Sequence, residues 1–240
     1  MNKLILIALF IVVLVMAGGL NLKNRLTGGN HDQEAGDSAA AKKDTLKWYA
    51  AKARREGKSS ATVAAPIVEY LGSADDPEFV LSNYSAVIAQ PIESKTVAVD
   101  EDKAIVTWYK FRRLETLRER PARPNLPAPT ILPPQELLPL DEDDFLVVKY
   151  GGSVDVDGMN VSMVDPDFPP FQINNRYLLF ISMLPAGVAH IWAGPTGTFR
   201  VMPDDSIEPV NKTERRMKAM LRTRFGNSVG SLKEHLGKNR

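Results

Sequence analysis

One short segment of the chain, residues 108–113, interleaves aromatic and basic side chains. Such a pattern can bind single-stranded nucleic acid, because bases stack on the rings and phosphates pair with the cations. It is also the pattern of an ordinary strand with a basic, solvated end, which would place Trp108 on one face and Tyr109 and Phe111 on the other. We favour a partner-binding surface on the exposed side of this strand over nucleic-acid binding. The candidate binding residues are Trp108, Tyr109, Lys110, Phe111, Arg112 and Arg113.

Two acidic motifs contain the oxygen ligands that hard cations prefer. Asp155, Asp157 and Asn160 resemble part of a calcium loop, but the third loop acid and the distant Glu of an EF-hand are missing. A β-hairpin explains the same residues without a metal. The acidic run Asp141 to Asp144 precedes a strand with no base or nucleophile beside it, which favours a solvated loop. We therefore predict no metal site and no cofactor.

The residue types that nucleophilic catalysis needs are sparse. The chain has no cysteine, which excludes thiolate catalysis and cysteine-based zinc sites. Its three histidines, His31, His190 and His235, are not at metal-ligand spacing. The sequence contains no Gly-x-Ser-x-Gly, phosphate-loop or dinucleotide motif. We expect a non-catalytic protein and assign no catalytic residue; an unrecognised enzyme is the second alternative.

The first residues carry the clearest signal for location. Leu4 to Leu20 is an uncharged, mostly apolar run that would form a helix of about 25 Å, the short end of what spans a bilayer. A cleaved signal peptide is the alternative, because Lys3 and the small residues Ala17 to Gly19 fit its two ends. We favour a single-pass membrane anchor with the folded domain outside the cytoplasm. Cleavage would instead give a secreted or periplasmic protein.

Charge is segregated along the chain although the net charge is only +1. Residues 69–170 contain 19 acidic and 9 basic side chains, whereas residues 211–240 contain 9 basic and 2 acidic ones. The basic tail could lie near anionic headgroups. A solvated or docked helical face is the simpler interpretation, and we favour it.

Helical patterns precede and follow a strand-rich centre. Asp44 can cap a helix that ends at Gly57, with Leu46, Tyr49, Ala50 and Ala53 on one face. Further helices are expected at 65–71, from Asp76 onward, after Asn211 and over Val229, Leu232 and Leu236. Strands are expected at 86–99, 104–117, 145–150, 177–183, 189–193 and 198–202, the last two forming a pair around residues 194–197.

The clearest local prediction is a hairpin around Asp157-Gly158, a dipeptide typical of type I′ turns. A two-residue turn pairs Val156 with Met159, and Val154 with Val161, on one face. The same register pairs Asp155 with Asn160 on the other face. One register therefore gives one apolar and one polar face, which supports it.

These elements predict a mainly β fold with flanking helices. An OB-like small β-barrel fits the number and alternation of strands, and a small β-sandwich is the alternative. The proline-rich segment 121–139 is expected to be irregular and could dock onto a partner. The expected organisation is an anchor at 1–20, a flexible linker at 21–43, a helical segment at 44–82, the barrel at 84–202 and a basic helical tail at 203–240.

Several blocks of the central segment resemble a loose group of exported bacterial proteins with an OB-like barrel, similar to netrin and tissue-inhibitor-of-metalloprotease modules. The resemblance implies this fold and an extracytoplasmic location and little chemistry. The cysteine pairs of true netrin-like modules are absent, so no inhibitor role follows from it. It covers about residues 84–201 and is carried by Tyr84 to Ala89, Lys149 to Gly152, Asp167 to Phe171, Arg176 to Phe180 and Gly194 to Phe199.

The resulting hypothesis is a membrane-tethered, extracytoplasmic binding module that acts without catalysis. The membrane is contacted through Leu4 to Leu20, and another envelope protein is the expected partner. The alternative is a cytosol-facing OB-type module that binds single-stranded nucleic acid through Lys110, Arg112 and Arg113. The sequence leaves the oligomeric state open.

Overall fold

The computed structural model describes residues 41–66, 77–121, 130–211, 219, 222–223 and 226–238. The chain divides into two units, residues 1–39 and residues 40–240, and every described residue belongs to the second. The apolar run Leu4 to Leu20, the expected linker up to residue 40 and, in the basic tail, residues 212–218, 220–221, 224–225 and 239–240 lie outside the described residues. No helix within the described ranges combines the length and apolarity needed to cross a membrane.

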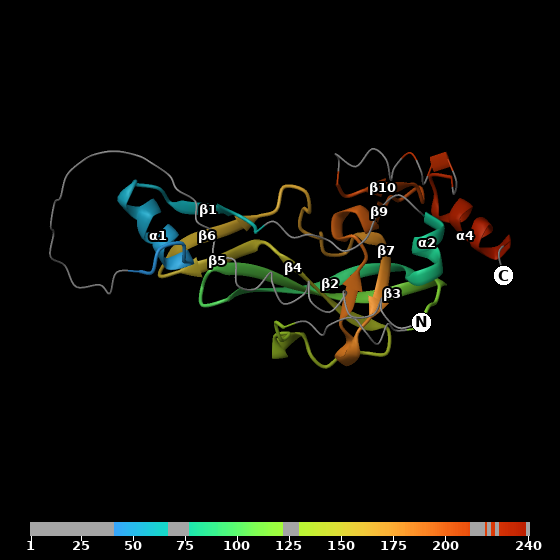
Figure 1. Cartoon of the computed structure of the whole chain (residues 1–240), viewed down its shortest axis with the longest axis horizontal. Coiled ribbons are helices and arrows are strands. Elements are labelled where there is room, and N and C mark those ends of the chain that lie inside the picture. The colour runs from blue at the N-terminus through green and yellow to red at the C-terminus, as the bar shows by residue number, and fades with distance from the viewer. Residues whose placement is uncertain are drawn as a thin grey trace, which may run out of the picture. The chain divides into compact units, whose positions relative to one another are not determined.

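The described part is mainly β, with few helices, as the sequence predicts. A three-stranded sheet, here called the small sheet, has the order β1 (Ser60–Ala64), β6 (Met159–Val164), β5 (Gly152–Val156). The large sheet has the order β10 (Ile207–Pro209), β9 (Thr198–Val201), β7 (Arg176–Met183), β2 (Ser85–Val99), β3 (Ala104–Arg118), β4 (Asp144–Tyr150), and β8 (Ala189–Ile191) pairs with β7. Figure 1 shows both sheets and the helices around them.

The long hairpin of β2 and β3 is the backbone of the large sheet and matches its prediction closely. The two strands pair antiparallel from Ala86 with Arg118 to Val99 with Ala104. The predicted turn at Asp100, Glu101 and Asp102 is present, and all three residues have positive φ angles, between 53° and 63°. Side chains other than glycine are disfavoured in this conformation, so the turn stores backbone strain.

The predicted hairpin at Asp157-Gly158 is confirmed in its register. Val156 pairs with Met159, and Asp155 pairs with Asn160, with positive φ angles at both turn residues. The sequence did not predict β1, which extends this hairpin into the small sheet by pairing parallel to β6, Ser60 beside Asn160. A strand at residues 60–64 lies in the segment that the sequence assigned to helices.

The strand β7 has six consecutive buried residues, as its apolar run indicates, but its neighbours differ from the prediction. Segments 189–193 and 198–202 were expected to pair with each other. Instead, β8 and β9 each pair antiparallel with β7, at different parts of its length. The short 3₁₀ turn Gly194–Gly197 connects them. The segment predicted as a helical tail contains a short strand, β10, which pairs antiparallel with β9.

Neither sheet closes into a barrel within the described residues, so the prediction of a closed barrel is wrong. The outer strands β4 and β10 are not paired with each other. The nearest approach to closure is one isolated parallel bridge between Leu146 in β4 and Val188, the residue before β8. A single bridge does not make a ladder, and the sheet stays open on this side.

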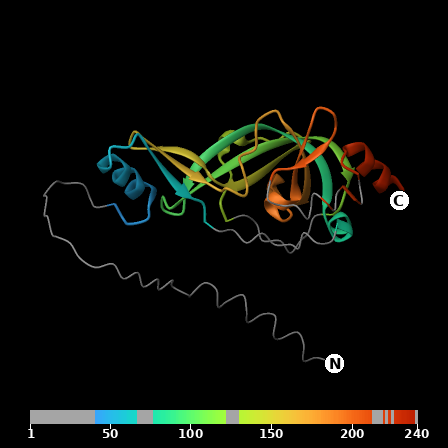
Figure 2. The same cartoon turned by 90° about the horizontal axis from the view of Figure 1, so that it is seen from above.

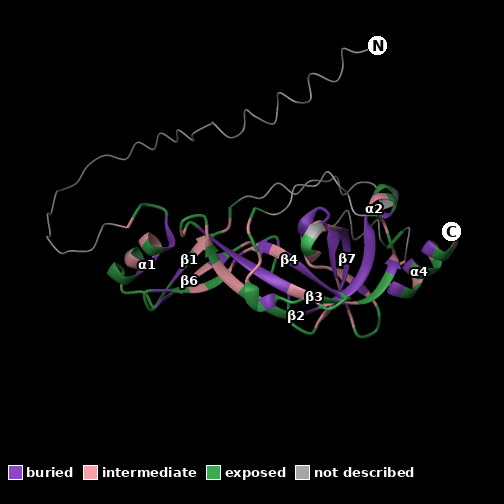
Figure 3. Cartoon of the chain, turned by 90° about the horizontal axis from the view of Figure 1, so that it is seen from below, coloured by how far each residue is buried: buried purple, intermediate pink, exposed green. Residues whose placement is uncertain are grey.

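Both faces of the large sheet are covered by apolar side chains, and much of its ribbon is accordingly coloured as buried in Figure 3. One face carries an aromatic cluster, here called the aromatic core, with Tyr109, Phe111, Phe145, Phe168, Phe171 and Tyr177. The opposite face is covered in two places. Helices α2 (Pro77–Asn83) and α4 (Val229–Lys238) pack there around Phe180 and Trp192, and the end of the proline-rich segment packs against Trp108. Because this face is covered by helices and a loop rather than by the small sheet, the sandwich alternative is not seen.

The described helices lie largely where the sequence predicts them. Helix α1 (Leu46–Arg55) buries Leu46, Ala50 and Ala53 against the small sheet, whereas α2 and α4 lie against the large one (Figure 2). The cap of α1 is Thr45 and not Asp44, because the Thr45 side chain accepts a hydrogen bond from the Trp48 backbone. The predicted α4 stripe is confirmed, since Val229, Leu232 and Leu236 are all buried. The expected helices at 65–71 and after Asn211 lie largely outside the described residues.

Candidate functional site

The predicted binding strand lies in the middle of β3, and its aromatic side chains are not exposed. Trp108 and Phe111 have no exposed surface, and Tyr109 has 4%. The predicted alternation is correct, because Trp108 packs on one face and Tyr109 and Phe111 on the other. Both faces are covered, however, so the expectation of an exposed aromatic surface here is wrong. These rings are core residues that stabilise the sheet.

The basic residues of the same strand are engaged by carboxylates. Asp144, whose side chain has no exposed surface, lies 3.0 Å from Arg112 Nε and 3.3 Å from Lys110 Nζ. Arg112 also contacts Asp141 at 3.0 Å, and Lys110 donates to the Pro139 carbonyl. The sequence interpretation of Asp141 to Asp144 as a solvated loop is therefore wrong for Asp144. This network ties β3 to β4 and leaves little free positive charge on the strand.

Burial and hydrogen bonds act on Asp144 in opposite directions. Burial alone would raise the pKa of its carboxyl, but hydrogen bonds from Arg112, the Asp141 backbone and Lys110 lower the pKa below its ordinary value. Arg113, the last of the candidate residues, is partly buried, and its Nε has no hydrogen-bond partner in the described structure.

The described end of the proline-rich segment, residues 130–139, contains no strand, as the sequence predicts. It forms a short 3₁₀ turn, Gln135–Leu137, and Leu137 is buried beside Trp108. Leu132 is 83% exposed and Leu138 44% exposed. This part of the segment therefore mainly covers its own sheet.

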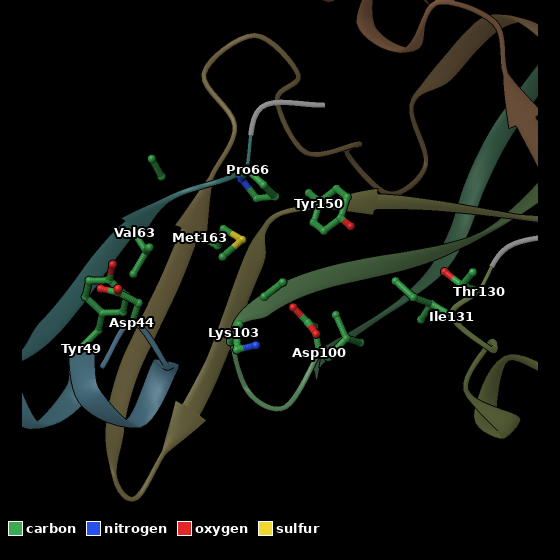
Figure 4. Close-up of a pocket in the computed structure, with 13 residues that line it drawn as sticks. Asp44, Tyr49, Val63, Pro66, Asp100, Lys103, Thr130, Ile131, Tyr150 and Met163 are labelled. Carbon is green, nitrogen blue, oxygen red and sulfur yellow. The ribbon is translucent and has the colours of Figure 1, made fainter. Parts of the chain in front are cut away.

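Among the described residues, a groove that the sequence did not predict has the size of a binding site (Figure 4). Its volume is about 680 Å³, within the range of small-molecule and peptide pockets. Five segments of the chain bring their side chains to it: the start of α1, the end of β1, the β2–β3 turn, the end of β4 and the end of β6. Thr130 and Ile131, in the described end of the proline-rich segment, complete it. The lining residues are Asp44, Tyr49, Val63, Ala64, Pro66, Val99, Asp100, Lys103, Ala104, Thr130, Ile131, Tyr150 and Met163.

Backbone contacts fix the position of two walls of the groove relative to each other. The Leu46 amide, at the start of α1, donates to the Asp102 carbonyl in the β2–β3 turn at 2.6 Å. Lys47 lies 3.9 Å from the Asp102 carboxylate. The strained turn is therefore held against the start of α1, where the first backbone N–H groups of a helix need acceptors.

The groove combines an apolar interior with an unpaired charged rim. Val63, Tyr150 and Met163 contribute apolar surface from three different strands. Asp44, Asp100 and Lys103 are exposed around it, and none of them forms an ion pair within the described part of the chain. Methionine and small side chains adapt to ligands of different shape. Such a site suits an extended, mostly apolar segment with charges at its ends.

A buried lysine lies outside the groove, on the face of the aromatic core. Lys149 is 8% exposed, and its Nζ donates to the Phe168 carbonyl at 2.5 Å and lies 4.9 Å from the Phe168 ring. Burial lowers the pKa of Lys149 to about 8, against the opposing effect of Asp165. Burial has the opposite effect on the acidic Tyr109 hydroxyl and raises its pKa to about 12. Lys149 joins two of the blocks that carry the resemblance to exported proteins, and its contacts are those of a loop anchor.

The described residues offer no grouping of three or more His, Cys, Asp or Glu side chains that could hold a metal ion. Asp155 accepts a hydrogen bond from the Gly158 amide at 2.8 Å, a contact within the hairpin turn. Of the histidines, His190 is on β8, where burial lowers its pKa, His235 is on α4, and His31 lies outside the described residues.

No protein-family model matches this sequence, and no curated protein is significantly similar to it. The groove and its surroundings are therefore interpreted from their own chemistry.

Proposed function

We propose that this chain is a non-catalytic binding module, tethered to a membrane, which holds an extended segment of a partner protein in the groove of Figure 4. The observation that carries the proposal is the combination of an apolar interior with three rim charges, Asp44, Asp100 and Lys103, that form no ion pair with any other described residue. Peptide-binding grooves use the apolar part for affinity and a few placed polar groups for orientation.

We further infer that the large sheet is a partly open barrel of the OB type. Three observations support it: β2, β3 and β4 form an antiparallel meander, β2 also pairs with β7, and Val188 before β8 approaches β4 in parallel. In an OB barrel the first strand pairs with two neighbours and the last strand closes on the third. The same connectivity agrees with the resemblance to exported proteins.

The proposed location is a cell membrane, with the folded domain outside the cytoplasm and an envelope protein as partner. Its support is the apolar run Leu4 to Leu20. The test is protease accessibility of a C-terminal tag in spheroplasts, with a cytosolic protein as control. Digestion of the tag is expected. Protection of the tag in intact spheroplasts, with digestion after lysis, would contradict the proposed orientation.

The proposed site is tested by photo-crosslinking in cells that produce the full chain. Benzoylphenylalanine replaces Tyr49 in the groove or, as the control, Phe79, an aromatic residue of α2 that is 46% exposed. We expect an adduct with another protein from position 49 only. Lys103→Glu should reduce it several-fold, whereas Lys95→Glu, an exposed lysine of the same hairpin outside the groove, should not. Equal adducts from both positions would contradict the site.

The nucleic-acid alternative has less support than its sequence pattern suggested. Its stacking residues, Trp108, Tyr109 and Phe111, are buried, and Lys110 and Arg112 contact Asp144. Base stacking needs exposed rings, and phosphate pairing needs available cations. An enzyme would need a base, a nucleophile and charge-stabilising groups that converge, and the polar groups of the groove instead lie around its rim (Figure 4).

A further inference from the structure

The strand β1 presents an open edge. Its neighbour on one side is β6, and in the described part of the chain no strand pairs on the other side. The Ala65 amide donates to the Val164 carbonyl of the β6 strand at 2.9 Å. Because backbone groups alternate along a strand, residues 61 and 63 also face β6, whereas Ser60, Thr62 and Ala64 direct their N–H and C=O groups to the open edge.

This edge lacks two of the features by which proteins protect sheet edges from pairing, a charged side chain and a proline, although the strand is short at five residues. The strand Ser-Ala-Thr-Val-Ala contains no charged residue and no proline. The other sheet edges that the structure describes differ in this respect. Strand β10 carries Glu208 and Pro209, β5 carries Asp155, and β4 is approached by Val188 and by the end of the proline-rich segment.

The sequence of β1 is complementary to itself in one antiparallel register. If Thr62 lies opposite Thr62 of a second copy, Ser60 lies opposite Ala64, and the outward backbone groups of all three positions pair. The exposed side chains are then small, and the central pair is Thr with Thr, a favourable cross-strand pair. Thr62 would lie on the two-fold axis, as an isologous interface requires.

Charge does not oppose this arrangement. Lys58, which precedes β1, is paired with Glu56 at 2.6 Å, and an antiparallel pair keeps the two Lys58–Glu56 pairs at opposite ends of the joined strands.

We propose that two copies of this chain associate through their β1 strands, Thr62 against Thr62, and join their small sheets into one six-stranded sheet. The inference does not depend on the proposed groove function. A two-fold axis perpendicular to the sheet places both α1 helices, and both grooves, on the same side. The dimer would therefore bind a partner bivalently, and linked sites raise the apparent affinity without new contacts.

The absence of cysteine from the chain allows a clean test with single-cysteine variants of the full chain in membranes. In the proposed register the Cα atoms of opposite residues are about 5.5 Å apart, within the range of a disulfide. On oxidation we expect a disulfide-linked dimer from Thr62→Cys. Neither Ser60→Cys nor Ala64→Cys alone should give one, because each lies about 13 Å from its own copy. Co-production of these two variants should give the linked pair.

Equal cross-linking of all three single variants would indicate random collision and overturn the register. A cysteine could also disturb the fold, so the mass of the unmodified full chain in detergent is a second measurement. Light scattering should give a dimer, Thr62→Pro should give a monomer because it removes an outward N–H, and Thr62→Val should remain a dimer. A monomeric unmodified chain would overturn the proposal. Photo-crosslinking from Tyr49 is expected to survive in Thr62→Pro, which separates this inference from the proposed function.

Discussion

The cores of the two sheets differ in composition, although they share the hairpin of β2 and β3. The aromatic core of the large sheet contains six buried aromatic residues, among them Phe111 and Phe171 at 5.0 Å between ring centroids. The core under α1 contains four buried alanines, two buried methionines and no buried aromatic ring. Rings packed edge to face fix one arrangement, whereas small and flexible side chains permit several.

This difference assigns different roles to the two regions. The large sheet is a scaffold in which Asp144 and Lys149 have partners, whereas Arg113 Nε and the ring nitrogens of Trp108 and Trp192 have none within the described residues. The region around the small sheet and the end of the β2–β3 hairpin contains the groove, the strained turn at Asp100 to Asp102 and the open edge of β1. Binding surfaces are commonly built at the less stable end of a structure, on a stable support.

The largest expected effect is a truncation in the aromatic core. Phe111→Ala should lower the free energy of unfolding by about 3–5 kcal/mol, because the ring is fully buried and its neighbours cannot fill the cavity. Met163→Ala, in the wall of the groove, should cost about 2 kcal/mol, since that site can relax. Urea unfolding followed by circular dichroism measures both. Equal losses would remove the contrast between the cores.

The pH dependence of stability should reveal Lys149 in the scaffold. Burial lowers its pKa from 10.5 to about 8, so between these values the unfolded chain binds more protons, and stability rises with pH. The gain across this window corresponds to about 3 kcal/mol. Lys149→Met should abolish the rise, as measured by unfolding between pH 8 and pH 10. An unchanged rise in the variant would show that another group causes it.

The buried Asp144 should make the scaffold sensitive to acid. Its pKa is lowered, so its contribution is present above the ordinary carboxyl pKa and is lost as the pH falls through the pKa of the folded state. Asp144→Asn removes the buried negative charge that Lys110 and Arg112 share and should cost about 2 kcal/mol at neutral pH. The free energy of unfolding of this variant should also fall less steeply with decreasing pH than that of the unmodified chain. Asp141→Asn, at the exposed end of the network, serves as the matched control and should cost little.

The smallest effect is expected at the strained turn. Glu101 has a φ angle of 53°, which is unfavourable for a residue with a side chain. Glu101→Gly should therefore raise the free energy of unfolding by about 0.5 kcal/mol, which is the strain relieved minus the larger conformational entropy that glycine loses on folding. Glu93→Gly, an exposed position within β2, should instead destabilise the chain by about 1 kcal/mol. A loss of stability in Glu101→Gly would show that the turn is not strained.

Local patterns in the sequence predict much of the scaffold. The alternation around Trp108, the register at Asp157-Gly158 and the apolar run of β7 each follow from neighbouring residues. Alternation shows that two faces differ, but it does not show that both are covered. The burial of Trp108 depends on Leu137, which is distant in sequence, and Asp144 is buried because Arg112 reaches it from another strand.

The groove could not be predicted for the same reason. Strand β1 is short, carries no apolar run and pairs in parallel with β6, about 100 residues later in the chain. The walls of the groove come from segments that only this pairing and the contact between Leu46 and Asp102 bring together. A signal that was available is the small-residue stripe of α1, which indicates close packing on a neighbour.

The contrast between a rigid scaffold and an adaptable binding region is tested most directly by native-state hydrogen exchange. We expect the amides of β7 and of the β2 segment paired with it to exchange only by global unfolding. The amides of β1 and β6 should exchange faster, through a local opening that urea accelerates little. Equal protection of both sheets, with the same urea dependence, would show one cooperative unit and contradict this account.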